Sequence, residues 1–334
     1  MDNDLLKLEL FDGMIAEYKP PASLLLTSRN ILPVVEDVGQ TVAWDIEKAE
    51  LDVQGFETLG GSAGVRKTNV IGHRTATLAR TFKSKRLPGA ALIDLRAPGS
   101  MNREAIAEAK VARETRTMLE FFARQNEYMR ARALQGSIAL AFEGGLVSTV
   151  DYGFLGGDHD ITPAPRWSDT GADIETDIAL AVKAIAQDSG RDAVYALCGS
   201  DVIAAIMKND RVTEYFAKTA AGTAYMQTRS MGQFQGLEWL VDDQVYKPAG
   251  GSNTPYVNPK DVIIFPAPDS EWGEFRVGSD VIPSDDRLSV IEKVGQYVYP
   301  NISINPASIE LFAGIVRLPI IRNVGAIAVI HALP

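Results

Sequence analysis

The sequence predicts an α+β protein that combines one long helix, β-strands before and after it in the chain, and a compact α/β block. Residues 102–135 contain neither glycine nor proline and carry a charge on nearly every turn, as expected of a single helix. Residues 41–95 and 297–333 show the alternation of β-strands. Between residues 166 and 299, helical and strand patterns follow one another, which is typical of a block that folds as its own unit.

The helix predicted over 102–135 would be a rod about 50 Å long. Ser100 and Asn102 are suitable N-caps, and Gly136 is a suitable stop. The apolar stripe of this helix is narrow, so only one edge of the rod should be buried. The stripe comprises Val111, Met118, Phe122, Met129 and Ala133. Because these positions do not hold a 3.5-residue repeat with leucine at d, a rod lying across a sheet is favoured over a coiled-coil strand.

The length of 334 residues suffices for two domains and a sizeable core. No apolar run approaches the roughly 18 residues of a membrane span, and the acidic N-terminus lacks the apolar region of a signal peptide. The single cysteine, Cys198, lies in a buried-strand pattern, which excludes internal disulfides and indicates an inert thiol. We therefore expect the protein to mature in a reducing cytoplasm and to have no membrane partner.

The net charge of −10 conceals a strong segregation of charge along the chain. Residues 1–57 hold twelve acidic and four basic residues, whereas residues 58–93 hold no acidic residue and seven basic ones. A chain with an acidic segment and a basic segment can pair with copies of itself, so the basic residues are candidate contacts between subunits. They are Arg66, Lys67, Arg74, Arg80, Lys83, Lys85 and Arg86.

Two segments before the long helix are expected to be extended. Residues 1–40 contain several prolines and too little periodicity for an independent element, so they should form an arm that gains order on another subunit. Residues 41–95 should form an exposed two-stranded excursion with a glycine-rich, flexible tip. Because an isolated hairpin is marginally stable in water, this excursion should dock on another surface.

Residues 138–153 should form a strand pair that belongs, with the C-terminal strands, to one sheet under the rod. The inserted block should contain helices over 173–188 and 201–217, with a buried strand at 192–198 between them. Further strands are expected within 234–246 and at 261–266, and the C-terminal strands at 297–304, 309–318 and 326–333.

Two motifs would suit an enzyme, but the context of both is weak. Residues 60–64 match the G-x-S-x-G nucleophile elbow around Ser62, but a basic β-like stretch follows where the elbow needs a helix. His331, which could complete a Ser…Asp…His order, lies in an apolar strand. Asp158-His159-Asp160 could bind a metal, yet no second ligand cluster stands at a useful spacing. An α/β or metal-dependent hydrolase using Ser62 or His159 is therefore the alternative, and we expect no catalytic, metal or cofactor site.

Nucleic-acid binding by the basic run 66–86 is a third hypothesis. The run contains Phe82 but no interleaved aromatic residues for base stacking, and the acidic remainder of the chain would repel phosphates. Pairing between subunits explains both the basic excursion and the acidic body, so we favour it.

Several stretches resemble segments of one protein family. Val298-Tyr299-Pro300, Arg317-Leu318-Pro319-Ile320-Ile321 and the strand 326–333 resemble the closing segment of the lambda-type major capsid protein E family of tailed phages. Residues 258–264 resemble that family's buried strand before the last turn, and residues 192–216 its strand–helix step. The order of parts also resembles the capsid architecture named after phage Hong Kong 97.

This resemblance implies a division of the chain into four parts. Residues 1–40 would be the N-terminal arm, residues 41–95 the extended β-hairpin called the E-loop, and residues 166–299 the inserted A-domain. The P-domain would comprise residues 96–165 and 300–334, with 102–135 as its spine helix.

The resemblance also implies a function without catalysis. Many copies, arranged as hexamers and pentamers, would assemble themselves into the icosahedral head shell of a tailed bacteriophage. The shell would enclose double-stranded DNA without sequence-specific contact, and scaffolding, portal and decoration proteins would be further partners. The protein would belong to the virion and would be assembled in the cytoplasm of the host bacterium.

Replacing Arg66, Lys67 and Arg74 together by glutamate should block assembly while leaving each subunit folded, because the charge that pairs neighbouring copies is reversed. Sedimentation measures assembly and circular dichroism measures folding. Shells that form at the normal yield would contradict the electrostatic part of this hypothesis.

Overall fold

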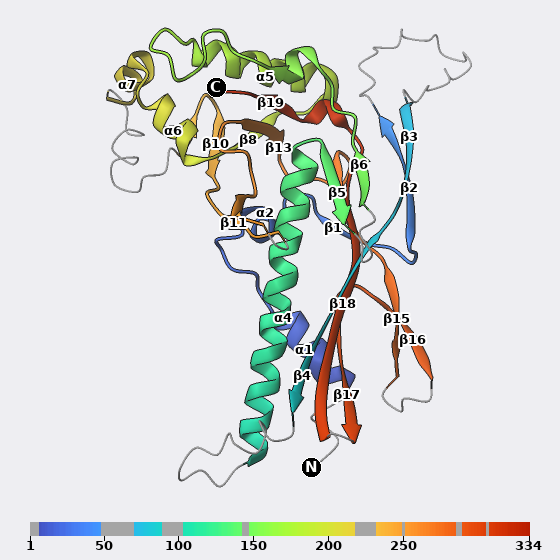
Figure 1. Cartoon of the computed structure of the whole chain (residues 1–334). Coiled ribbons are helices and arrows are strands. Elements are labelled where there is room, and N and C mark those ends of the chain that lie inside the picture. Colours follow the sequence, from blue (N-terminus) through green and yellow to red (C-terminus); the bar gives the residue numbers. More distant parts are fainter. Residues whose placement is uncertain are drawn as a thin grey trace, which may run out of the picture.

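The computed structural model describes residues 7–47, 70–88, 103–141, 147–217, 232–248, 251–284, 289–304 and 307–334. Its longest element is α4 (Arg103–Leu134), a helix of 32 residues that stands beside a twisted sheet (Figure 1). The strands of this sheet are β1 (Val34–Glu36), β14 (Gly273–Val277), β18 (Ala307–Ile321), β17 (Tyr297–Ile304) and β4 (Ala79–Pro88). β18 pairs with β14, β17 and β4, so it is the strand that holds the sheet together.

The apolar stripe predicted on the long helix is buried. Val111, Met118, Phe122, Met129 and Ala133 each have an exposed fraction of 6 % or less, and they belong to a core shared with β18 and β14. The rod on a sheet is therefore confirmed, and it begins at Arg103 and ends at Leu134. The stripe did not predict that two charged residues of α4, Glu127 and Arg130, would be buried as well.

The described part of the N-terminal segment folds on its own chain, which corrects the prediction of an arm that gains order on another subunit. α1 (Leu8–Glu17) contacts β17 and α4, and α2 (Leu25–Ser28) contacts α4. Phe11 and Leu26 are fully buried, and β1 pairs in parallel with β14. Periodicity was too weak to show this docking because α1 and α2 each bury a single side chain and β1 buries none.

The buried charges of α4 bind the backbone of this segment. The carboxylate of Glu127 accepts hydrogen bonds from the N–H groups of Leu26 at 2.8 Å and Thr27 at 2.7 Å. The Nε–H of Arg130 donates to the carbonyl of Ile31 at 2.6 Å. The helix therefore supplies the hydrogen bonds that water would otherwise make to this backbone.

The predicted excursion is only half correct. β2 (Thr41–Glu47) and β3 (Val70–Thr77) pair as an antiparallel hairpin, and residues 48–69, including the expected tip, lie outside the described residues. The second half is not part of the hairpin, because β4 pairs with β18 over its whole length. A single residue, Leu78, lies between β3, which belongs to the hairpin, and β4, which belongs to the larger sheet. Its side chain is buried in the core.

The α/β block is built on a six-stranded sheet in the order β7–β19–β13–β8–β10–β9. The strands are β7 (Asp160–Ile161), β19 (Ala328–Ile330), β13 (Val262–Pro266), β8 (Ala193–Cys198), β10 (Leu237–Val241) and β9 (Gln233–Phe234). α5 (Ile174–Ser189) and α6 (Ser200–Ile206) bury apolar residues against this sheet and form a second core. The predicted helix at 173–188 and strand at 192–198 are confirmed within one residue.

The helix predicted over 201–217 is two helices, α6 and α7 (Asp210–Ala217). Asn209 separates them: its side-chain oxygen accepts a hydrogen bond from the N–H of Arg211 at 3.1 Å, as an N-cap does. Its side-chain N–H group also donates to the carbonyl of Ala172 at 2.9 Å. This buried asparagine therefore ends one helix and begins the next.

Three strand pairings differ from the prediction. β5 (Ser137–Ala141) and β6 (Val147–Asp151) form a separate hairpin and do not join the C-terminal strands. The last strand, β19, joins the six-stranded sheet, whereas β14, from within the expected inserted block, pairs with β18. Alternation identifies a strand but not its partner, because the edge of every strand presents the same N–H and C=O groups.

Two small strand pairs and two short helical turns complete the described elements. β11 (Val245–Tyr246) pairs with β12 (Thr254–Pro255), and β15 (Ser279–Pro283) pairs with β16 (Val290–Val294). The turns are η2 (Gly157–His159) and η3 (Val324–Ala326). Within the described ranges, no helix is both long enough and apolar enough to cross a membrane.

Replacing Glu127 by alanine should lower the free energy of unfolding by about 2–4 kcal/mol, because two buried N–H groups lose their acceptor. The matched control is Glu120→Ala on the same helix. Glu120 makes only long, solvent-exposed ion pairs with Arg116 (3.8 Å) and Arg124 (3.9 Å), so its loss should cost about 0.5 kcal/mol or less. Urea unfolding of both variants measures the contrast, and equal losses would show that Glu127 does not hold the N-terminal segment.

Candidate subunit-interface surface

The structure divides the predicted basic residues between two elements. Arg66 and Lys67 lie outside the described residues. Arg74 is exposed on β3, and its guanidinium lies close to Gly153, in the loop after β6. The other four residues, Arg80, Lys83, Lys85 and Arg86, lie on β4 in the sheet beside α4. The basic segment is therefore not one free finger, since most of its described residues belong to a strand of their own subunit.

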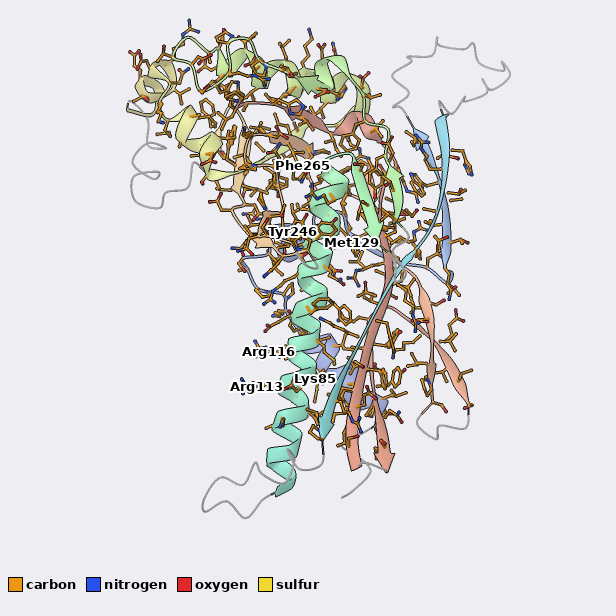
Figure 2. The ribbon with its side chains drawn as sticks, viewed as in Figure 1. Lys85, Arg113, Arg116, Met129, Tyr246 and Phe265 are labelled. Atoms are coloured by element: carbon orange, nitrogen blue, oxygen red, sulfur yellow. The ribbon has the colours of Figure 1, made fainter. Side chains whose placement is uncertain are left out.

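The basic side chains of β4 alternate between the two faces of the sheet. On the α4 side, the Nζ atom of Lys83 lies 3.4 Å from the ring centre of Phe121, a cation–π contact. Figure 2 shows Lys85 beside α4, at the height of Arg113 and Arg116. All three are exposed. Basic side chains are therefore exposed both on β4 and on the N-terminal half of α4, where Arg116 also pairs with Glu120 at 3.8 Å.

On the opposite face, Arg80 is neutralised within its own chain. Its Nε–H donates to Asp280 Oδ2 at 2.6 Å, and an Nη2–H donates to the hydroxyl of Tyr297 at 3.4 Å. Its guanidinium lies 4.7 Å from the ring centre of Phe82. Burial alone would lower the pKa of Arg80, but the bonds to Tyr297 and Asp280 raise it. The charge of Arg80 therefore already has a carboxylate partner within the subunit.

Four aromatic rings form a row across this same face. Tyr297 and Tyr299 lie on β17, Phe312 on β18 and Phe82 on β4, with successive ring centres 6.2, 5.3 and 5.5 Å apart. Gly314 makes the row possible, because a Cβ atom there would overlap the Tyr297 hydroxyl. Sequence analysis found Phe82 isolated among basic residues. Its aromatic neighbours come from two other strands, so only the register of the sheet brings them together.

Of the residues considered for hydrolysis, His159 and His331 lie within the described part of the chain. Ser62 lies outside the described residues. His159 is buried, and its ring nitrogens lie 3.0 Å from the carbonyl of Ile327 and 2.9 Å from Asp188 Oδ2. No group of three or more His, Cys, Asp or Glu among the described residues is arranged to hold a metal ion. Burial raises the pKa of the Cys198 thiol, as expected of an inert core cysteine.

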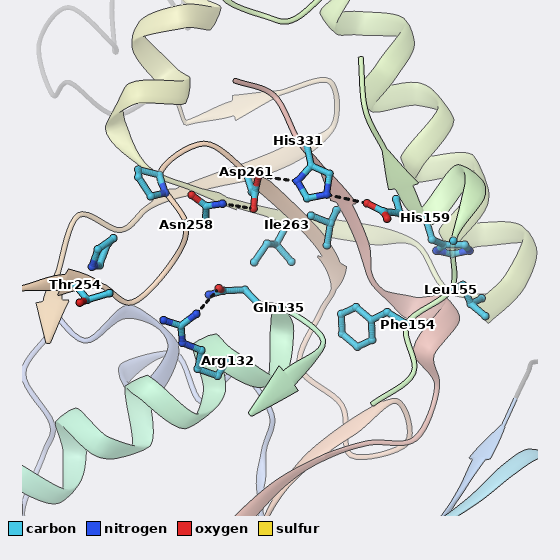
Figure 3. A pocket seen from close by; sticks show the side chains of 15 residues that line it. Arg132, Gln135, Phe154, Leu155, His159, Thr254, Asn258, Asp261, Ile263 and His331 are labelled. Atoms are coloured by element: carbon cyan, nitrogen blue, oxygen red, sulfur yellow. Dashed lines mark hydrogen bonds and ion pairs between the residues drawn. The ribbon is translucent and has the colours of Figure 1, made fainter. Parts of the chain in front are cut away.

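His331 lines a cavity of about 520 Å³ between the C-terminal end of α4 and the six-stranded sheet (Figure 3). Its ring lies between two carboxylates, 2.9 Å from Asp160 Oδ1 and 2.8 Å from Asp261 Oδ1. The side-chain N–H of Asn258 donates to the other oxygen of Asp261 at 2.7 Å. These polar groups form hydrogen bonds with one another, so they link β7, the start of β13 and the chain after β19. None of these four groups is an activated nucleophile.

Comparisons with known proteins are consistent with a structural role. The sequence profile of the family described as phage major capsid protein E matches residues 20–281, more than three quarters of the chain. A search of curated proteins found no match.

Three solved structures are similar to this one over most of their length. One is a protein assigned as the capsid protein of an Escherichia coli prophage (TM-score 0.63, 13% identity, 98% of this chain and 99% of that chain). Another is a phage-related protein from Bordetella bronchiseptica (TM-score 0.59, 13% identity, 98% and 99%). The third is from the mature capsid of bacteriophage PhiM1 (TM-score 0.51, 10% identity, 94% and 87%). At these identities the likeness establishes the fold, which is the mixed α+β capsid fold of the Hong Kong 97 type.

Replacing His331 by glutamine should remove part of the pH dependence of stability. Burial alone would lower the pKa of His331, but the bonds to Asp261 and Asp160 and their charges raise it above its ordinary value of 6.5. Its stabilising contribution is therefore complete below pH 6.5 and is lost as the pH rises through the raised pKa. Between pH 6 and pH 8, unassembled subunits should lose about 0.5–1 kcal/mol that His331→Gln does not lose, since the half-exposed site is screened by solvent.

Urea unfolding at the two pH values measures this difference. His73→Gln is the control, because His73 contacts Asp45 in an exposed pair on the hairpin. A wild-type stability that falls equally in His331→Gln would contradict the role given to the two carboxylates.

Proposed function

The chain belongs to the phage major capsid protein E family, and we propose that its copies build the head shell as hexamers and pentamers. It is a major capsid protein of a tailed phage, a structural protein of the icosahedral virion shell and not an enzyme. The observation that carries this conclusion is the family match over most of a chain that has a phage capsid fold.

Exposed apolar side chains on a projecting hairpin support self-association. Val281 on β15 is 55 % exposed, and Val290 and Ile291 on β16 are 69 % and 38 % exposed. β15 and β16 pair only with each other among the described strands, and two-stranded sheets are marginal in water. By the register of the two strands, Val281 and Val290 share one face and Ile291 lies on the other. Exposed apolar groups on such an element are typical of a surface that another subunit covers.

The charge pairing between subunits is proposed in a narrower form than the sequence suggested. Asp12 binds Lys293 at 2.5 Å and Asp37 binds Arg276 at 2.6 Å, so part of the acidic N-terminal segment is already paired within the subunit. Together with the Arg80–Asp280 pair, this leaves Arg66, Lys67 and Arg74 of the E-loop and Lys83, Lys85 and Arg86 of β4 as the proposed basic contacts. Each of these contacts would be weak, but a shell would contain many of them. A misplaced subunit could therefore dissociate and bind again during assembly.

The division into parts is also proposed in a revised form. The arm would remain 1–40, and the E-loop would be 41–78 in place of 41–95, since β4 pairs with β18. The A-domain would be the block around the six-stranded sheet. It would end near Pro266, and the later strand β19 would also belong to it. β14 and β17 would belong to the P-domain with α4.

The shell would enclose double-stranded DNA without sequence-specific contact. A net charge of −10 would limit non-specific attraction to phosphate, which suits a container from which DNA must leave. Scaffolding, portal and decoration proteins would be further partners of the shell.

Purified subunits should assemble into closed shells, because the proposed contacts lie on every copy and are satisfied only by neighbours. Analytical ultracentrifugation and negative-stain electron microscopy over a range of salt and protein concentrations measure this. A monomer or a small closed oligomer under every condition would contradict the proposed function.

A further inference from the structure

A groove of about 740 Å³ lies between the β2–β3 hairpin and the β5–β6 hairpin. Its walls are the consecutive residues 74–77 of β3 and 148–151 of β6, together with Thr41 and Trp44 of β2. Side chains of successive strand residues point to opposite faces, so consecutive residues border a groove where the edge of the strand faces it. Figure 1 shows the two hairpins next to each other, each as a pair of strands separate from the larger sheets.

Among the described residues, no strand pairs with the edge of β3 that faces away from β2. The N–H of Leu78 donates to the carbonyl of Gln40 at 2.8 Å, so these two residues form a hydrogen-bonded pair of the antiparallel ladder. Hydrogen-bonded and non-hydrogen-bonded pairs alternate along such a ladder. By the register of β2 and β3, Thr75 and Thr77 therefore occupy non-hydrogen-bonded pairs. Their N–H and C=O groups point away from β2.

The same alternation of pairs shows which backbone groups of β6 point away from β5. The N–H of Tyr152 donates to the carbonyl of Gly136 at 3.0 Å, which makes them a hydrogen-bonded pair. In the register of β5 and β6, Thr149 and Asp151 then occupy non-hydrogen-bonded pairs. Their backbone groups point away from β5, and β6 has no second partner strand among the described residues.

A buried side chain in the groove also lacks a partner. Trp44 is only 3 % exposed, and its indole N–H has no acceptor in the described structure. A buried donor without an acceptor costs about 1–3 kcal/mol, so this wall of the groove is not at its most favourable in the described structure. The exposed side chains of Arg74 and Asp151 lie on opposite walls, so the groove carries one charge of each sign.

We propose that an extended segment of a second copy of the chain binds in this groove as an additional β-strand. Its backbone pairs with Thr75 and Thr77 on β3 and with Thr149 and Asp151 on β6. The two hairpins and the inserted strand then form one continuous sheet. This inference rests on the proposed function, because the shell supplies the second copy.

Two features favour a second copy as the occupant. Unpaired strand edges are sites of uncontrolled association, and in a self-assembling shell the chain present beside every edge is another subunit. Backbone pairing also places few demands on side chains, which suits walls formed largely by threonine and serine.

Hydrogen exchange followed by mass spectrometry tests the proposal on purified subunits and on shells assembled from them. Backbone amides in peptides covering 70–78 and 147–152 should exchange at least about tenfold more slowly in shells than in unassembled subunits, because their free N–H groups gain acceptors. Unchanged exchange of both peptides in intact shells would overturn the proposal while leaving the proposed function in place. Failure of the subunits to form any shell would remove the proposed function and this inference with it.

A pair of substitutions at one position isolates the edge of β3. Thr75→Pro removes only an N–H that points into the groove, and proline is tolerated at such a position of an edge strand. Thr75→Val keeps that N–H and is the matched control. Thr75→Pro should raise the subunit concentration needed for assembly by about 2- to 10-fold, the effect of one lost hydrogen bond, whereas Thr75→Val should not. Equal assembly of the two variants, with unchanged circular dichroism of the free subunits, would contradict pairing at β3.

Discussion

The packing of the N-terminal segment on α4 depends on two charged side chains that α4 buries, Glu127 and Arg130. A carboxylate and a guanidinium are costly in an apolar interior unless hydrogen bonds replace the water they lose. Burial raises the pKa of Glu127, although the N–H groups of Leu26 and Thr27 oppose the shift. Burial lowers the pKa of Arg130 to about 10, although the charge of Glu127 opposes it. The N-terminal segment is therefore the partner that allows α4 to carry these charges inside the protein.

A third buried charge ties α4 to the central strand of the sheet, although two of its donor atoms, Nε and Nη1, have no acceptor among the described residues. Arg317 of β18 is fully buried, and its Nη2–H donates to Gln125 of α4 at 3.0 Å. Burial and the nearby charge of Arg130 lower its pKa to about 9. Arg130 also lies over the ring of Phe275 on β14, 4.1 Å from its centre. Because such contacts have direction, they fix the position of helix, sheet and N-terminal segment more narrowly than apolar packing alone would.

Assembly then depends on what the subunit leaves unsatisfied. Several charges that could have paired with neighbours are neutralised internally, as in the pairs Arg80–Asp280, Asp12–Lys293 and Asp37–Arg276. Among the described residues, exposed apolar side chains on β15 and β16 and edges of β3 and β6 without a partner strand remain. A shell built from many modest contacts of this kind can reject a misplaced subunit, because each contact is weak and only the closed set is strong.

The local elements followed from the sequence because their causes are local. The hydrogen bonds of α4 and α5 join residues four apart, and the apolar period of 3.6 shows which side is buried, so both helices were predicted within a residue of their ends. Strand partners were decided only in the folded chain. β4 and β19 each joined a sheet other than the expected one, and β14, which no predicted strand covered, joined the sheet of β18. A strand edge can pair with any other edge, and alternation does not identify the partner. The aromatic row, the partner of Arg80 and the groove beside Trp44 all depend on that pairing, so no pattern in the sequence could place them.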